Sequence, residues 1–206
     1  YLNIASVHYL LGDYSSAIGS LDQAIEQNAN TEIQLINYWI RSIIHTADRN
    51  MEQLSNVANE AESFMQEKPS HPLFKYIPML MNLNKQLLQS NLDSALSIYE
   101  ELNEIEYFAA RYYPALALLY LQENNFKGAL EFVNKMRNVG IASDVWGYVY
   151  PRSFYIEGRM FEKQGYVEQA ILSFERLLNI WQEGDEAIPE RQYAINRLQE
   201  LQRVTN

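Results

Sequence analysis

Histidine side chains are the first candidates for chemistry in this sequence, because imidazole serves both as a general acid or base and as a metal ligand. His8 and His45 lie 37 residues apart, at a repeat position that Tyr120 and Phe161 also occupy. Because aromatic residues share this position, we interpret both histidines as packing residues. His71 lies in the segment PSHP, without carboxylates at the spacing of a metal site.

Acidic pairs are the second candidates. Glu60 and Glu62, like Glu100 and Glu101, are too close in sequence to share one helix face, so they cannot form a directed acid–base pair. The sequence has no phosphate-binding glycine loop, nucleophile elbow or HExxH motif. The absence of cysteine excludes thiolate zinc sites and cysteine nucleophiles. We therefore predict that the protein is not an enzyme and has no cofactor or metal site.

The composition is that of a folded acidic protein, with 48% hydrophobic residues and a net charge of −10 over 206 residues. Nucleic-acid binding needs a basic face, and the sequence shows none. The longest apolar run, residues 112–121, is about half of the 20 residues that span a bilayer, so we expect no membrane insertion. The first residue is Tyr1, so we expect a fragment of a longer protein. The compartment stays open, with the cytoplasm favoured.

A repeated pattern defines the elements that position these side chains. Five segments share a two-residue turn followed by apolar residues spaced as on one helix face. They align on Ala17, Leu54, Ala95, Ala129 and Ala170, with successive spacings of 37, 41, 34 and 41 residues. A second apolar helix precedes each of these. Such a hairpin cannot bury its apolar faces alone, so consecutive hairpins must stack.

This pattern resembles the tetratricopeptide repeat. The fourth segment fits it best, with Tyr113, Ala117, Tyr120 and Ala129 at signature positions, whereas Leu54 replaces the expected alanine in the second. The resemblance implies an all-α fold, a right-handed α–α superhelix of about five helical hairpins plus a C-terminal capping helix. As one array over residues 1–206, the hairpins are expected at 1–29, 33–67, 73–104, 108–138 and 150–181, and the capping helix at 188–203.

A second resemblance covers only the C-terminal part, where PRSFYIEGRMFEKQG and LLNIWQEGDEAIPERQYAINRLQEL are similar to the last repeats of large bacterial signalling proteins. In those proteins a serine/threonine kinase, adenylate cyclase or transcription-regulator domain precedes a tetratricopeptide array. The residues that carry this likeness are Trp181, Asp185, Pro189, Glu190, Arg197 and Leu198. This resemblance implies an alternative function, the regulatory or dimerisation arm of such a protein.

In tetratricopeptide arrays the first helix of each hairpin lines the concave groove, so the resemblance implies a non-catalytic scaffold that binds a peptide or helix there. The candidate partner-binding residues are Tyr9, Trp39, Ile43, Leu80, Arg111, Arg152, Tyr155 and Arg159. Other groove positions include Leu2, Ser6, Ile36, Ile77, Asn84 and Leu118. This groove is apolar early and basic late, which suits a protein partner with apolar anchors and an acidic end.

Two alternatives stay open for these residues. The early apolar positions either bind a partner or are covered by further repeats or by a second copy in a homodimer. Likewise, Trp39 lies either in the groove, where its removal weakens binding with little loss of fold, or in the core, where removal costs about 3 to 5 kcal/mol.

Longer connections are expected at residues 66–74 and 138–150, where the spacing between repeats is largest. The second connection contains Trp146, Tyr148 and Tyr150 around Gly147. These aromatic residues form either a binding tip or an extension of the preceding helix that packs down.

Overall fold

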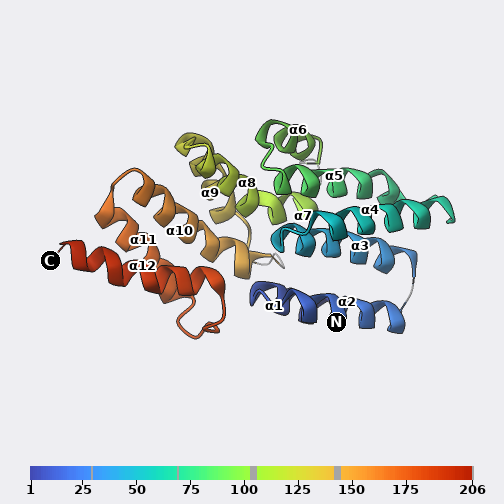
Figure 1. The fold of residues 1–206 in the computed structure, drawn as a ribbon, viewed down its shortest axis with the longest axis horizontal. Helices are drawn as coiled ribbons and strands as arrows, with labels where there is room; N and C mark the ends of the chain where they lie inside the picture. Colours follow the sequence, from blue (N-terminus) through green and yellow to red (C-terminus); the bar gives the residue numbers. More distant parts are fainter. Residues whose placement is uncertain (29, 69, 103–105, 142–144, 206) are drawn as a thin grey trace. The chain divides into compact units, whose positions relative to one another are not determined.

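The helices carry all regular structure in the described part of the chain. The computed structural model describes residues 1–28, 30–68, 70–102, 106–141 and 145–205, in which every regular element is a helix (Figure 1). The prediction of an all-α helical-repeat fold is confirmed. The chain divides into two compact units, Tyr1–Glu104 and Ile105–Asn206, and each is described by itself. The prediction of one array over residues 1–206 stays a prediction.

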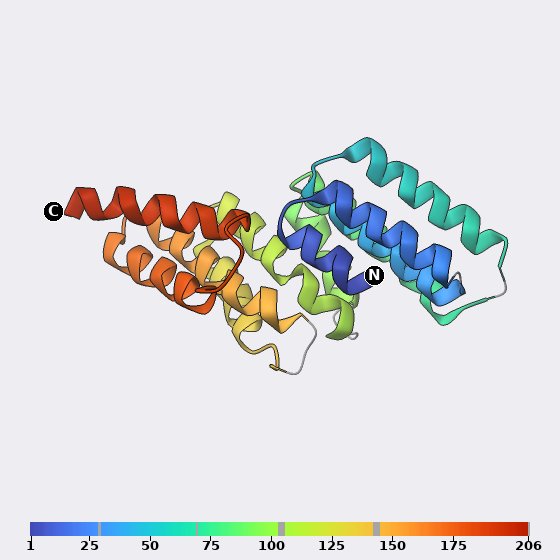
Figure 2. The ribbon, with the colours of Figure 1, turned by 90° about the horizontal axis from the view of Figure 1, so that it is seen from below.

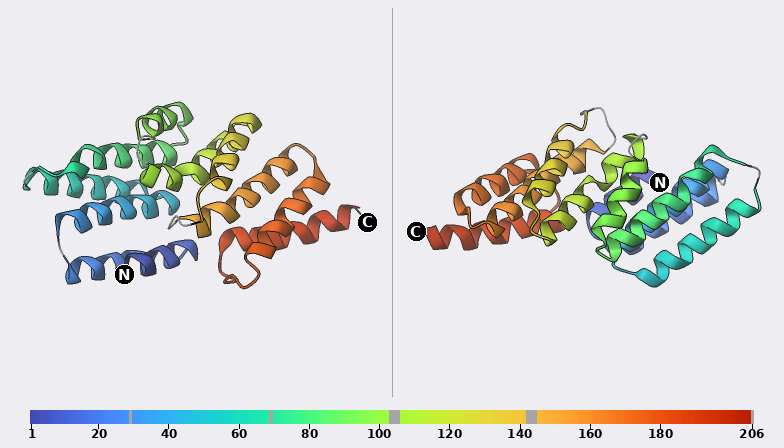
Figure 3. Two further views of the ribbon diagram at one scale, coloured as in Figure 1. Left: turned by 180° about the vertical axis from the view of Figure 1, so that it is seen from behind. Right: turned by 90° about the horizontal axis from the view of Figure 1, so that it is seen from above.

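The first unit consists of helical hairpins that follow one another along the chain. Its elements are α1 (Leu2–Leu10), α2 (Tyr14–Gln27), α3 (Thr31–Ala47), α4 (Met51–Gln66), the short 3₁₀ helix η1 (Pro72–Lys75), α5 (Ile77–Leu88) and α6 (Leu92–Leu102). Helix α5 packs on both α3 and α4, and the three lie side by side in Figure 3. The first helix of one hairpin thus covers the preceding hairpin, as stacking requires.

The second unit repeats this arrangement. Its elements are α7 (Glu106–Ala109), the 3₁₀ helix η2 (Ala110–Tyr112), α8 (Tyr113–Gln122), α9 (Phe126–Arg137), α10 (Trp146–Lys163), α11 (Val167–Ile180) and α12 (Pro189–Thr205). Helix α10 packs on α8 and α9, and α12 lies along α11 (Figure 2). The α12 side chains Ala194, Leu198 and Leu201 join the core around Phe174. Helix α12 therefore covers an apolar face of the last hairpin.

One turn geometry joins the two helices within each hairpin. A residue with positive φ ends the first helix, and the next amide donates to the carbonyl five residues earlier at 2.9 Å. The positive-φ residues are Gly12, Arg49, Ser90, Asn124 and Gly165. Aspartate or asparagine usually follows and caps the second helix, as Asp13 does by accepting from the Ser16 amide. This geometry explains the two-residue turn of the sequence pattern.

The alignment residues of the repeat are core residues. Ala17, Ala95, Ala129 and Ala170 have no exposed surface, and Leu54 is also buried. An alanine side chain is small enough for the two helices of a hairpin to approach closely at this point. The sequence therefore identified the contact line between the helices.

A close approach in the last hairpin depends on Gly158. A Cβ atom at this position would lie 2.5 Å from a ring carbon of Phe174, whose side chain is fully buried. We expect Gly158→Ala to destabilise the protein by about 1 to 3 kcal/mol, because overpacking outweighs the helix-propensity gain. Urea unfolding measures this change.

Gly19→Ala is the matched control, because Gly19 lies within α2 and a Cβ there meets nothing within 4 Å. This variant should stabilise the protein by about 0.5 to 1 kcal/mol. Equal effects of the two substitutions would contradict the close packing of α10 on α11.

The aromatic residues near position 147 lie on a helix rather than on a loop tip. Tyr148 and Tyr150 belong to the first turns of α10 and are half-buried. The Tyr150 ring packs edge-on against the Phe154 ring at 5.5 Å. These two tyrosines therefore extend the helix that follows the connection, α10, rather than the preceding helix, and they do not form a loop tip. Residues 142–144 and the side chain of Trp146 lie outside the described part.

Candidate functional site

Partly exposed apolar side chains on α1 and α3 form the part of the predicted binding surface that stays accessible in the first unit. Leu2 and Tyr9 on α1, and Ile36 and Ile43 on α3, are half-buried. The Tyr9 ring lies 6.2 Å from the ring of Tyr14, which orients it from the second helix of the same hairpin. These side chains are held by packing yet keep surface that a partner can cover.

Two of the predicted contact residues are core residues instead. Trp39 is 1% exposed and Leu80 has no exposed surface. A partner cannot reach side chains that the chain itself covers, so we remove both from the set of candidate contacts. Of the two alternatives for Trp39, the structure places its indole in the core.

A buried polar network also lies at a predicted groove position. The Asn84 side chain on α5 donates to Ser42 Oγ on α3 at 2.7 Å, and the Ser42 hydroxyl donates to the Trp39 carbonyl at 2.6 Å. Both polar side chains are buried. Because a buried amide without partners is costly, this network favours one register of α5 on α3.

The basic residues predicted at the late end of the groove are engaged by α12. Arg152 on α10 is buried, and its Nε donates to Glu190 Oε1 on α12 at 2.6 Å. Its charge is therefore balanced within the unit. Arg111, in η2, is half-buried.

Arg159 makes a different kind of contact. Its guanidinium carbon lies 5.5 Å from the ring centres of both Tyr155 and Tyr193, and Nη1 donates to the Tyr155 hydroxyl at 3.2 Å. The two tyrosine rings meet edge-on at 5.4 Å. Burial raises the pKa of Tyr155, with the positive charge of Arg159 acting in the opposite direction. The phenol therefore stays neutral near pH 7, and the two rings and this hydrogen bond orient Arg159.

Sequence reasoning missed an ion-paired cluster between α9, α10 and α11. Arg137 Nη2 lies 2.8 Å from Glu157 Oε2, which also accepts the Ser173 hydroxyl at 2.8 Å. Glu157 stands where the repeat pattern expects leucine, and this departure was the available signal. Because the cluster joins three helices, we interpret its role as structural.

His45 is a packing residue with an unusual titration. It is half-buried, and burial lowers its pKa below the usual 6.5, with Arg41 as a further cause and Asp48 and Glu60 opposing it. Because the folded state favours neutral imidazole, its contribution to stability is complete above about pH 6.5 and is lost as pH falls toward the lower folded value. The histidine thus couples stability to pH.

We expect protonation of His45 to lower the stability of the protein as pH falls below about 6.5, and His45→Phe to remove this contribution. Phenylalanine is the residue that the last hairpin carries at this position, as Phe161. Urea unfolding of both proteins across the pH range measures the effect. An unchanged pH dependence in the variant would contradict the burial of this imidazole.

Neither a metal-ligand cluster nor a membrane-spanning helix is found among the described residues. No group of three or more His, Asp or Glu side chains in the described ranges could hold a metal ion. No helix described there is both long and apolar enough to cross a bilayer.

Comparison with known proteins finds a family match for the first hairpin. Residues 1–31 match the family model described as Tetratricopeptide repeat, and this segment contains α1 and α2. No curated protein and no solved structure matches the chain. The hairpins and this match define the class, a helical-repeat protein of the kind that typically serves as a protein-interaction scaffold. The chain thus contains a tetratricopeptide repeat, as the sequence predicts.

Proposed function

We propose that the chain is a non-catalytic interaction scaffold that binds a peptide or helix of a partner protein on the first helices of its hairpins. The observation that carries this proposal is the set of partly exposed apolar side chains on α1 and α3, among them Tyr9 and Ile43. Because these side chains are already fixed on packed helices, mainly the ligand loses conformational entropy on binding. Preformed apolar contacts of this kind favour peptide recognition.

In the second unit the proposed contacts are Arg111, Tyr155 and Arg159. Arg152 is paired with Glu190, whereas Arg159 is held between two tyrosine rings. We infer that Arg159 is the residue that meets an acidic group of the partner. A carboxylate would add charge-assisted hydrogen bonds to a guanidinium that is already oriented.

Selection from a random peptide library tests this function. Peptides selected on the whole chain should lose at least tenfold in affinity on Ile43→Glu, because the substitution places a charge in the apolar surface of α3. Glu52→Gln, an exposed change on α4, is the control for the fold and should leave binding unchanged. Selected peptides that bind the Ile43→Glu variant as tightly as the original chain would contradict the proposal.

A second candidate function, self-association as a regulatory or dimerisation arm, is favoured by α1. Ile4 and Val7 on this helix are 48% and 54% exposed, and Tyr1, directly before it, is 44% exposed. An exposed apolar stripe of this kind is typical of an interface. Light scattering over a concentration series distinguishes the candidates, since self-association predicts a mass that rises toward twice 24.1 kDa. Val7→Lys should abolish that rise.

A further inference from the structure

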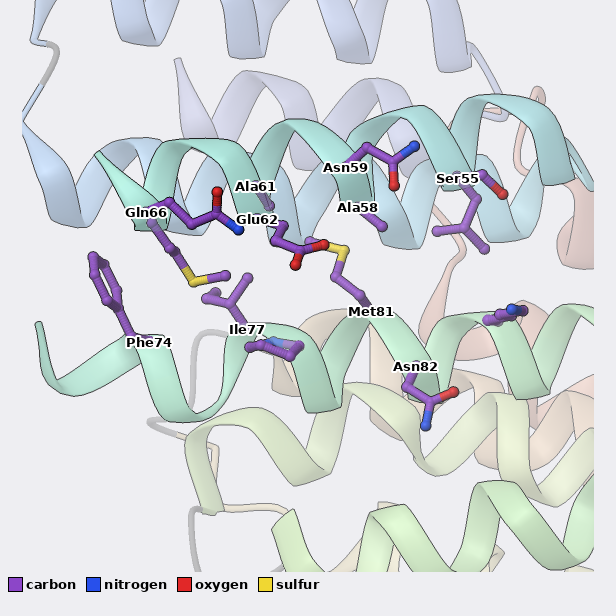
Figure 4. A pocket seen from close by; sticks show the side chains of 14 residues that line it. Ser55, Ala58, Asn59, Ala61, Glu62, Gln66, Phe74, Ile77, Met81 and Asn82 are labelled. Atoms are coloured by element: carbon purple, nitrogen blue, oxygen red, sulfur yellow. The ribbon is translucent and has the colours of Figure 1, made fainter. Parts of the chain in front are cut away.

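A cavity opens between α4, the second helix of the second hairpin, and α5, the first helix of the third. It has a volume of about 680 Å³ and lies within the first unit. Its floor and walls are apolar, with Ala58, Met65, Phe74, Ile77 and Met81 among the lining residues. Figure 4 shows these side chains between the two helices, with Met81 reaching from α5 toward α4.

The sequence of the second hairpin explains the space. Four residues after the alignment position, Leu21, Val133 and Phe174 are fully buried in their hairpins. The second hairpin has Ala58 there, which is only half-buried and lines the cavity. A small side chain thus stands where other hairpins place a large one, and the volume it leaves faces α5.

The connection between α4 and α5 widens the same cavity. Residues 66–74 belong to one of the two longest spacings in the repeat, and Phe74 in η1 lies at one end of the cavity (Figure 4). The His71 ring lies 6.0 Å from the Phe74 ring. The longer connection therefore supplies an aromatic wall that a shorter loop would lack.

The polar lining residues lie on the rim rather than on the floor. Ser55, Asn59, Glu62, Gln66, Asn82 and Lys85 line the cavity and are exposed. Leu54, Ala61, Ile77 and Met81 are buried beneath them. An apolar floor with a polar rim is complementary to an amphipathic helix, whose apolar side chains insert while its polar face meets the rim and water.

Dimensions and charge specify this occupant further. Ser55 and Gln66 mark the ends along α4, a length of about 16 Å. A helix with apolar anchors at i, i+4 and i+7 spans about 10 Å and fits this length. In Figure 4, the chain runs from Phe74 near Gln66 along α5 toward Asn82, which lies nearer the Ser55 end. Lys85 comes about one turn after Asn82 on α5 and so lies at the Ser55 end of the cavity, whereas Glu62 lies closer to the other end. The complementary helix therefore carries an acidic residue toward Lys85 and a basic residue toward Glu62.

We propose that the cavity between α4 and α5 is a second docking site, which binds an amphipathic helix of a partner protein with its acidic end at Lys85. The methionines support this assignment, because flexible thioether side chains adapt to the shape of inserted apolar groups. The site goes beyond the proposed function, since it uses the second helix of a hairpin. It does not require a ligand on α1 or α3.

A helical peptide tests the proposal. The probe is a fluorescent alanine-based helix of about sixteen residues with leucines at i, i+4 and i+7, glutamates in its first turn and lysines in its last. We expect saturable binding to the whole chain by fluorescence anisotropy. The same peptide with its leucines scrambled should bind at least tenfold more weakly.

Filling the cavity gives the decisive variant. Ala58→Phe should reduce probe affinity at least tenfold while the chain keeps or gains thermal stability, because the ring fills empty apolar space. Asn56→Phe is the matched control, since Asn56 is exposed on α4 and does not line the cavity. It should leave binding unchanged. Ile43→Glu should also leave probe binding unchanged, which separates this test from that of the proposed function.

Charge reversal tests the orientation. Lys85→Glu should weaken binding of the probe about two- to fivefold and strengthen binding of a probe with glutamates and lysines exchanged by a similar factor. If Lys85→Glu affects both probes equally, the proposed orientation is wrong. If only a small apolar dye binds in an Ala58-dependent way and neither probe does, the cavity is a small-molecule site and the helix proposal is overturned.

Discussion

Replacing Trp39 with alanine should lower the free energy of unfolding by about 3 to 5 kcal/mol. The indole is 1% exposed, so the substitution removes a large apolar group and leaves a cavity. The neighbouring α3 residue Ser42 carries the buried contact to Asn84, so a collapse around Trp39 would also disturb the α3–α5 contact. Urea unfolding followed by circular dichroism measures the change.

Leu172→Ala is the control for this experiment, because Leu172 is an apolar residue of α11 that is 54% exposed. We expect it to change stability by less than about 1 kcal/mol. If Trp39→Ala lowers stability as little as Leu172→Ala does, the indole lies at the surface and Trp39 is again a candidate contact residue.

The second large effect is expected at the cluster of Arg137, Glu157 and Ser173. Arg137→Met should destabilise the protein by about 2 to 3 kcal/mol, because it leaves the buried Glu157 carboxylate without its guanidinium partner. This value allows for the partial exposure of the arginine, whose side chain is 26% exposed.

A double variant separates charge pairing from simple loss of contacts. Arg137→Met combined with Glu157→Leu should be within about 1 kcal/mol of the original protein, because a matched apolar pair replaces a matched ion pair. The hydroxyl that accepts from Arg137 Nε, that of Ser153, keeps its hydrogen bond to the Tyr150 carbonyl. The Ser173 hydroxyl keeps the Gln169 carbonyl as its acceptor.

Lys135→Met is the control for loss of an exposed charge on α9. Lys135 pairs with Glu131 at 3.4 Å on the same helix, and this loss should change stability by less than about 0.5 kcal/mol. A double variant as unstable as Arg137→Met alone would show that Arg137 stabilises the protein through packing on Phe154 rather than through Glu157.

The hairpins could be predicted from sequence because their signals are local. The buried alanines, such as Ala17 and Ala170, recur with fixed apolar partners on one helix face. The turns also have local signals, since glycine at Gly12 and Gly165 and the Asp13 cap define where one helix ends and the next begins.

The binding surface was predicted less well, because exposure depends on contacts between helices. The resemblance to the tetratricopeptide repeat assigns Trp39 and Leu80 to the groove, yet both are buried in the structure. Arg152 was expected to meet a partner, but Glu190, 38 residues later in α12, pairs with it. No local pattern encodes a pairing over that separation.

The cavity between α4 and α5 could not be predicted from the sequence either, although the departures from the repeat pattern were visible there. Leu54 in place of alanine made the second repeat the poorest match, and the residues at 66–74 were expected as a longer connection. Only the packed structure shows that Ala58 and Phe74 leave a shared space. Departures from a repeat pattern are therefore places where a specific function can be sought.

Hydrogen exchange on the complex with a library-selected peptide tests the central claim most directly. If the chain is a scaffold that binds on its first helices, the peptide should slow amide exchange in α1 and α3 while α2 and α6 stay unchanged. If none of the selected peptides slows exchange in α1 or α3, the account is contradicted.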